Sequence, residues 1–288
     1  DHRDLHSFPT RRSSDLSGMY DTVVGQYLDT TGSYNSVFGT YYNNGPLQKL
    51  TQVYGDRNTV LGAGNIVGIG KDNTKIKSDE NTVIGVLNQV TGDGSIVVGN
   101  ATTVNGENAT SIGHVNHIYN HQEGGGQWGV ALGNHLTVKG DYALAAGNDS
   151  TAQGEDAVAI GHSTSTSGKY ALAMGSGSTA AGQSTAIGYK AKAQNDAIAI
   201  GDNAKAGNNG IAVGMHATAG YGQNMALGYY ASVANDVKNS TALGYGSQVT
   251  KRDILKSDGN DGVISVGRAV GQSGEKGLTR RIINVRAG

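Results

Sequence analysis

A short apolar run that ends in glycine recurs along almost the whole chain, and this repeat constrains the fold more than any other feature. It reads DTVVG at Gly25, NTVIG at Gly85, DAIAIG at Gly201 and STALG at Gly244. Most successive glycines of the series stand 13 or 14 residues apart, and five gaps are longer, at 16 to 23 residues. A fixed period this short indicates a solenoid in which each period forms one coil.

Each period has room for two short strands and two tight turns. A second apolar pair follows each anchor glycine at the third and fifth positions, as at Ala191 and Ala193 or Leu136 and Val138. Because a strand needs about five residues, 13 residues leave only tight, glycine-assisted turns between strands. The period of two and the density of glycine exclude helices. The sequence therefore predicts an all-β fold, a β-solenoid of 13–14-residue coils.

The two strands of a coil differ in their faces. After the glycine, apolar residues alternate with polar ones such as Lys192, which is typical of a strand with one solvent-exposed face. Before the glycine both faces are apolar, with Ile198 and Ile200 on one and Ala197 and Ala199 on the other. We expect the branched residues to point into the coil and the small ones to pack against something outside it. No other segment matches that pattern, so the expected cover is a second copy of the chain, which predicts a homo-oligomer.

Composition excludes several classes of protein. The chain has 288 residues, with 46 glycines, two prolines and no cysteine, and its net charge is −1. Collagen is excluded because glycine does not recur at every third residue. A net charge near zero offers no field for nucleic acid or an anionic membrane, and no apolar run of 18 residues predicts a spanning helix. No GxSxG, GxxxxGK[ST] or HExxH motif occurs, so we expect neither an enzyme nor a cofactor.

Residues 1–16 lie outside the repeat. The string HSFPTRRSSDL contains one of the two prolines and one of the two phenylalanines, and it matches the translation of a common sequencing adapter. We therefore predict that residues 1–16 are a non-native or disordered leader and exclude them from fold reasoning. On this interpretation the chain is a fragment whose natural N-terminus is missing.

The repeats and the end of the chain together resemble a known family. Repeats such as NDAIAIGDNAKAGNNGIAVG are followed by SVG at residues 265–267 and by LTRRIINVRAG at residues 278–288. These segments resemble the head and neck of YadA-like trimeric autotransporter adhesins. The resemblance implies a left-handed parallel β-roll over residues 17–267, three chains around a threefold axis, and a neck over residues 268–288 that leads to a coiled-coil stalk. It places the trimer and neck contacts at Arg280, Arg281, Ile282, Ile283, Asn284 and Val285.

The function implied by the resemblance is multivalent attachment. The chain would be the head of an adhesin exposed at the outer membrane of a Gram-negative bacterium, and its partners would be two further copies of itself and host matrix proteins, cell-surface receptors or glycans. Membrane attachment would come only through an anchor beyond this segment. The alternative is a structural spacer rod that carries a different binding tip.

Insertions in the repeat supply the candidate contact residues, because binding side chains usually lie on loops of a regular scaffold. The insertion over residues 40–56 brings together Tyr41, Tyr42 and Tyr54, and a later insertion contains the only tryptophan, Trp128. These residues are the candidate binding surface, although rings that merely cover the roll are the alternative. His114, His117 and His121 have a spacing that could present zinc, but a solvated loop is favoured and no metal is predicted. The KSDGNDG segment near residue 258 lacks the acidic residue of a calcium loop and is read as a turn.

Overall fold

The chain folds as two compact units, residues 1–157 and 158–288, which are described separately. The structure is a computed structural model that describes residues 6–7, 15–40, 42–44, 47–70, 73–119, 126–254, 262–268, 277 and 280. Within these residues both units consist of strands, with one turn of 3-10 helix, η2 (Lys251–Asp253), in the second. None of the described residues forms a helix long and apolar enough to cross a membrane.

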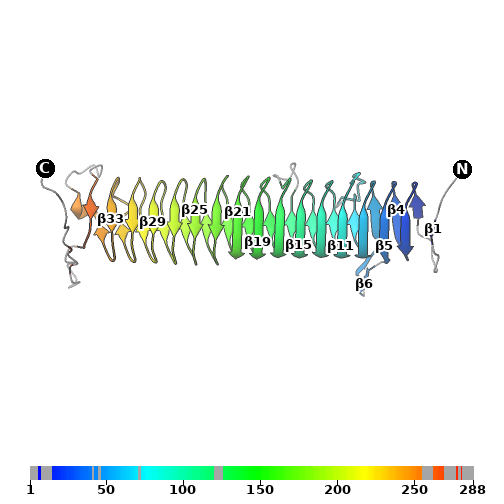
Figure 1. Ribbon diagram of the computed structural model, residues 1–288, viewed down its shortest axis with the longest axis horizontal. Helices are drawn as coiled ribbons and strands as arrows, with labels where there is room; N and C mark the ends of the chain where they lie inside the picture. The colour runs from blue at the N-terminus through cyan, green and yellow to red at the C-terminus, as the bar shows by residue number, and fades with distance from the viewer. Residues whose placement is uncertain are drawn as a thin grey trace. The chain divides into compact units, whose positions relative to one another are not determined.

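In the first unit, one strand from each coil enters a parallel sheet whose repeats pair in register (Figure 1). Gly85 pairs with Gly62 on one side and with Gly99 on the other, and the anchor glycines continue in this way through the unit. The strands are β1 (His6–Ser7), β3 (Thr22–Gly25), β5 (Ser36–Thr40), β9 (Thr59–Ala63), β11 (Thr82–Val86), β13 (Ile96–Asn100), β15 (Thr110–His114), β17 (Val130–Asn134) and β19 (Leu144–Asn148).

The strands that follow the glycines form a second parallel sheet in the same unit. They are β2 (Asp15–Ser17), β4 (Leu28–Thr31), β8 (Thr51–Tyr54), β10 (Ile66–Val67), β12 (Gln89–Val90), β14 (Thr103–Val104), β16 (His117–Ile118), β18 (Thr137–Val138) and β20 (Thr151–Ala152). An antiparallel hairpin, β6 (Tyr42–Asn44) with β7 (Leu47–Lys49), branches off before β8. Parts of residues 1–16 thus pair as β1 and β2, and the interpretation of that segment as a leader stays a prediction.

The second unit repeats the arrangement with shorter coils. Its first sheet contains β21 (Val158–His162), β23 (Leu172–Met174), β25 (Thr185–Ile187), β27 (Ile198–Ile200), β29 (Ile211–Val213), β31 (Met225–Leu227), β33 (Thr241–Leu243) and β35 (Ile264–Ser265). Its second sheet contains β22 (Ser165–Thr166), β24 (Thr179–Ala180), β26 (Lys192–Ala193), β28 (Lys205–Ala206), β30 (Thr218–Ala219), β32 (Ser232–Val233) and β34 (Gln248–Val249). The predicted parallel β-solenoid of 13–14-residue coils is confirmed.

The inside and outside of the doubly apolar strand are the reverse of our expectation. Ala197 and Ala199 lie inside the coil, whereas Ile198 and Ile200 point outward and are 38% and 37% exposed. The expectation was wrong because the smaller of the two alternating sets fills the interior between the sheets, which is alanine in the second unit and mostly valine in the first unit. The larger side chains of the first sheet point outward and form the face that needs cover.

Interior residues change along the chain. In the first unit, the buried position of the first sheet holds valine from Val23 to Val97, whereas alanine holds it from Ala131 onward and throughout the described strands of the second unit up to Ala242. The alternation of polar outward residues in the second sheet is confirmed, since Lys192 and Lys205 are exposed beside buried alanines. The wider N-terminal roll that this pattern predicts stays a prediction.

A ladder of buried asparagines joins successive coils of the first unit. The Asn58 amide donates from Nδ2 to Asn35 Oδ1 at 3.2 Å and to the Ser78 carbonyl at 2.8 Å. Its Oδ1 accepts from the Asn81 backbone N–H at 3.0 Å and from Asn81 Nδ2 at 3.2 Å. Asn35, Asn58 and Asn81 are each only 1% exposed. The polar residue before each strand therefore serves the coil interior, because it satisfies backbone groups that no water reaches.

A charged cluster lies on the neighbouring turns. Lys77 Nζ lies 2.7 Å from Asp56 Oδ2 and 3.1 Å from Asp79 Oδ2, and Arg57 pairs with Glu80 at 2.7 Å. The hydrogen bond from Lys77, aided by one from a backbone N–H, lowers the pKa of Asp56 below its ordinary value. The cluster ties coils together at the surface of the first unit.

Candidate functional site

The first predicted contact residues divide between an insertion and the roll itself. Tyr42 lies in hairpin strand β6 and is half-buried. Tyr54 belongs to β8, a strand of the second sheet, and the Lys75 ammonium lies 5.3 Å from the centroid of its ring. Tyr41 lies outside the described residues. The insertion therefore ends before Tyr54, and the tyrosine cluster of residues 41–54 stays a prediction.

Trp128 occupies a regular turn. Its backbone N–H donates to the Glu107 carbonyl at 2.9 Å, its φ is +55°, and its side chain is 52% exposed. Tyr142, one coil further on, has the same left-handed backbone and is 60% exposed. The order of the first sheet places four coil steps between Trp128 and the coil of Tyr54, so the two do not share a site.

The histidines lie in the same unit. His114 and His135 make an edge contact at 5.7 Å between ring centroids, and His117 stacks on Tyr119 at 4.0 Å. His121 lies outside the described residues. Across the part of the chain that the structure describes, no group of three or more His, Cys, Asp or Glu side chains could hold a metal ion.

Of the predicted neck residues, Arg280 is described. Its guanidinium donates to Ser247 Oγ at 2.8 Å and to the backbone carbonyls of Tyr245 and Val266. These contacts lie within one chain and cap the last turns of the second unit. Arg281, Ile282, Ile283, Asn284 and Val285 lie outside the described residues, as do residues 255–261 of the turn with KSDGNDG, so the trimer contacts of the neck stay a prediction.

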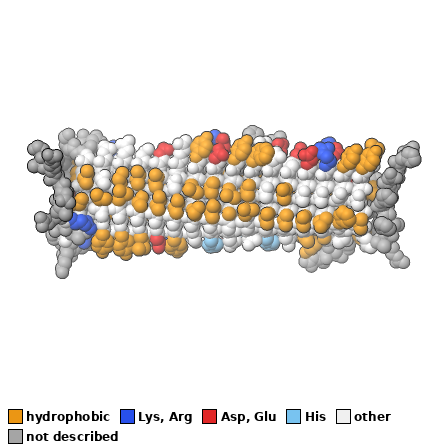
Figure 2. All heavy atoms as spheres, viewed as in Figure 1, with side chains coloured by type: hydrophobic (Ala, Val, Ile, Leu, Met, Phe, Trp, Pro, Cys, Tyr) orange, Lys and Arg blue, Asp and Glu red, His pale blue; other side chains and the backbone are white. Residues whose placement is uncertain are grey.

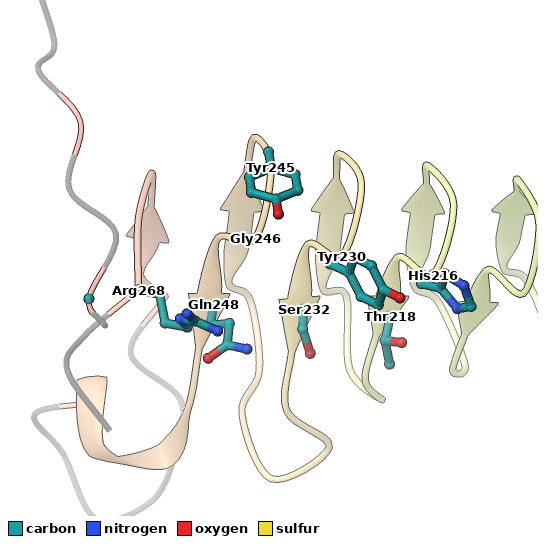
Figure 3. A pocket seen from close by; sticks show the side chains of 9 residues that line it. His216, Thr218, Tyr230, Ser232, Tyr245, Gly246, Gln248 and Arg268 are labelled. Atoms are coloured by element: carbon teal, nitrogen blue, oxygen red, sulfur yellow. The ribbon is translucent and has the colours of Figure 1, made fainter. Parts of the chain in front are cut away.

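An open groove of about 570 Å³ lies beside the last coils of the second unit (Figure 3). Its floor is a row of polar residues on the outer face of the second sheet, where Thr218 pairs in register with Ser232 and Ser232 with Gln248. The other described lining residues are His216, Tyr230, Tyr245, Gly246, Arg268 and Gly277. Aromatic faces, neutral polar groups and one cation therefore meet in one open concave surface, which offers stacking and hydrogen-bonding groups together.

The aromatic wall of the groove is a packed cluster. His216 stacks on Tyr230 with 4.8 Å between ring centroids and 7° between planes. Tyr229 makes an edge contact with Tyr230 at 4.4 Å and stacks on Tyr245 at 5.6 Å. A side-chain hydrogen bond with Tyr230 raises the pKa of Tyr229 above its ordinary value. Packing of this kind holds the rings in place before any ligand arrives.

The groove was not among the predicted sites, because its residues belong to regular coils and not to insertions. The signal was available in the regular repeat, where the residues just after three successive anchor glycines read Met215-His216, Tyr229-Tyr230 and Tyr245-Gly246. Since each such pair begins the same turn, the spacing alone aligns the rings.

The outward face of the first sheet is a second candidate surface. In the second unit it exposes Ile198, Ile200 and Val213, and in the first unit it exposes Phe38 and residues in register with it. Figure 2 shows hydrophobic side chains in rows over these strands in each unit. No described segment covers the rows, although apolar patches of this extent usually mark an interface.

Comparison with known proteins assigns the repeats. The family model for the YadA head domain repeat matches residues 91–114, 139–164, 167–183, 181–204 and 194–217, which include some of the coils of each unit. The chain therefore contains YadA head domain repeats. The crystal structure of the collagen-binding domain of the Yersinia adhesin YadA also matches, with 22% identity over 69% of this chain and 76% of that chain and a TM-score of 0.34. No curated protein matches.

The matched repeats include part of the outward face of the first sheet and end beside the groove. Four of the five matched segments lie at least partly in the second unit, and the last of them reaches Ala217, one residue before the groove floor begins at Thr218. The groove therefore adjoins a regular YadA repeat, whereas hairpin β6–β7 lies in a stretch that the family model does not match.

Proposed function

We propose that this YadA-like head works as a homotrimer that attaches bacteria to host cells, extracellular matrix or other surfaces. It would be exported and displayed at the outer membrane of a Gram-negative cell. The observation that carries the proposal is the row of branched apolar side chains on the outward face of the first sheet, because such a face needs a partner and the repeats belong to an adhesin head.

The outward residues suit contact between identical chains. Ile200 pairs in register with Val213, so the branched side chains of successive coils form a straight row across the strands of the sheet. Identical rods placed side by side would bring equivalent rows together over many coils. Because alanine fills the interior of the coils in the second unit, the larger side chains of the first sheet remain available for burial between chains.

Attachment by such a head rests on avidity. A threefold arrangement gives three identical binding faces, and simultaneous engagement of two or three raises the effective affinity by about 10²–10⁴ without any new contact. The polar outer face of the second sheet stays at the surface when the first sheet is covered. The groove and the exposed tyrosines and tryptophan are the candidate contact surfaces there.

The experiment uses beads coated with the chain and a panel of matrix proteins, glycans and cultured cells. We expect the wild-type chain to attach to at least one surface. The double variant Ile200→Asp with Val213→Asp should fold as separate chains and lose attachment. Lys205→Asp places the same charge on the outer face of the second sheet and is the matched control. Absence of attachment to the entire panel would contradict the proposal.

The spacer alternative is not favoured, because its uniform coils leave no reason for a hairpin or an aromatic groove. Deletion of residues 41–50 leaves β8 intact and tests the hairpin separately. Attachment that survives both this deletion and loss of the groove would return the spacer to consideration.

A further inference from the structure

On one side of the groove, two stacked rings are followed in the next coil by a glycine. The second residue after each anchor glycine repeats with the same backbone, so that His216, Tyr230 and Gly246 follow one another with φ of 56°, 56° and 61°. Each N–H in the row donates to the preceding coil, as Tyr230 does to Met215 at 3.0 Å and Gly246 to Tyr229 at 2.8 Å. The row therefore advances by one coil at each step.

Gly246 leaves one face of Tyr230 without a stacking partner from this row. The coil spacing of a parallel sheet is about 4.8 Å, which equals the 4.8 Å between the rings of His216 and Tyr230. His216 covers one face of Tyr230. A ring placed over Gly246 would cover the other face at the same distance, and Tyr230 and Gly246 both line the groove (Figure 3).

Polar groups surround this position. Ser232 and Gln248 project from neighbouring strands of the groove floor, and they supply a hydroxyl and an amide that both donate and accept hydrogen bonds. Arg268 also lines the groove, and a guanidinium group is suited to planar paired bonds with carboxylates and sulfates. A fitting ligand thus has a flat apolar face, hydroxyl groups at its edge and a nearby negative charge.

We propose that the groove binds an acidic oligosaccharide through one pyranose ring, which stacks on Tyr230 above Gly246. Ser232 and Gln248 bond its hydroxyls, and Arg268 pairs with its carboxylate or sulfate. The proposal rests on the adhesin function proposed above and names the class of ligand that one of its surfaces takes. Three copies of the groove would engage a polymer with repeated acidic sugars.

A sugar fits this surface better than a peptide does. An extended peptide gains much of its affinity from main-chain hydrogen bonds to an open sheet edge, and the groove floor is the outer face of a sheet, where only side chains are offered. Ser, Thr and Gln side chains along the floor match adjacent hydroxyls. The aromatic ring meets the apolar C–H face of a pyranose.

The test is titration of the whole chain with soluble oligosaccharides by calorimetry. The probes are a uronic-acid oligosaccharide, a sulfated oligosaccharide, a neutral one of equal length and a set of aromatic peptides. The decisive variant is Gly246→Tyr, which fills the position with a ring, since Tyr230 shows that this backbone accepts tyrosine. Its matched control is Tyr170→Ala, which removes an exposed tyrosine with φ of 58° from the same unit.

We expect one or both acidic probes to bind, and the one that binds identifies the charged group. Gly246→Tyr should weaken binding at least tenfold with unchanged circular dichroism and thermal midpoint, and Gln248→Ala should weaken it about tenfold, the loss of one or two hydrogen bonds. Arg268→Gln should remove both the preference over the neutral probe and the salt dependence. Tyr170→Ala should bind as wild type does.

Several results would overturn the inference: no binding of either acidic probe, equal binding by Gly246→Tyr, or binding of the peptides alone. Bead attachment separates this outcome from the adhesin proposal. Attachment without sugar binding would contradict the groove assignment but not the adhesin proposal. Sugar binding without attachment to any surface would contradict the adhesin proposal but not the groove assignment.

Discussion

The substitution Asn58→Ala tests whether the buried asparagine ladder holds the coils of the first unit together. Asn58 donates to Asn35 and to the Ser78 carbonyl, and it accepts two bonds from Asn81. Alanine keeps the backbone and removes all four side-chain bonds. Asn58 is only 1% exposed, so water does not reach the groups that lose these bonds.

The cost follows from the groups left behind. The Ser78 carbonyl, the Asn81 backbone N–H and the Asn81 amide lose their partner at Asn58. Each buried polar group without a partner costs about 1–3 kcal/mol. Because such costs are not additive between neighbours, we expect the free energy of unfolding to fall by about 3–6 kcal/mol.

The assay is urea unfolding followed by tryptophan fluorescence. Trp128 is the only tryptophan of the chain and lies in the first unit, so its signal reports that unit. Circular dichroism recorded on the same samples shows whether the transition is cooperative, which repeat proteins do not guarantee. The control is Asn100→Ala, in which an exposed asparagine of β13 is removed from the same unit. We expect its effect to stay within about 0.5 kcal/mol.

Equal stability of Asn58→Ala and Asn100→Ala would refute the reasoning. It would mean that the ladder bonds are replaced by water or by movement of the coils, and that the buried asparagines are not what joins them.

Three further predictions concern the backbone, the interior and the charged cluster. Gly85→Ala should destabilise the first unit by at least about 3 kcal/mol in the same urea assay. The φ of Gly85 is 125°, and a Cβ there would lie 1.8 Å from a carbonyl oxygen of the next coil. The control Ala101→Gly, at a φ of 54°, should be neutral or stabilising. Ala199→Leu should cost the second unit about 1–3 kcal/mol by overpacking, measured by circular dichroism, and an unchanged midpoint would contradict a filled interior. Lys77→Met should lower the thermal midpoint at pH 7 but not at about pH 2. The pKa of Asp56 is lowered in the folded chain, so its ion pair contributes stability above the unfolded pKa near 3.9, and this contribution is lost as pH falls through the folded pKa. A difference between variant and wild type that persists at pH 2 would contradict this.

The regular part of the fold could be predicted because the period fixes it. Once Gly85 and Gly99 are aligned, every residue between them has a defined place in a coil, and the structure pairs them as expected. The solvent-exposed face of the second sheet at Lys192 and Lys205 could be predicted from the alternation of polar and apolar residues.

The direction of the doubly apolar strand could not be predicted in the same way. When both alternating sets are apolar, the pattern does not say which set is inside, and size decides through the distance between the sheets. That distance depends on the turns, so Ala199 lies inside and Ile200 outside. The groove could not be predicted in this way because its residues come from several coils. In the sequence, only the equivalent positions of His216, Tyr230 and Gly246 in three successive coils indicate that they lie in one row.

The central proposal is that copies of the same chain cover the outward face of the first sheet. Sedimentation equilibrium of the purified chain tests it directly. We predict a mass of three times 29.5 kDa for the wild type. The double variant Ile200→Asp with Val213→Asp should have the mass of a single chain, and Lys205→Asp should remain trimeric. A folded wild-type chain that sediments as a monomer at micromolar concentration would contradict it.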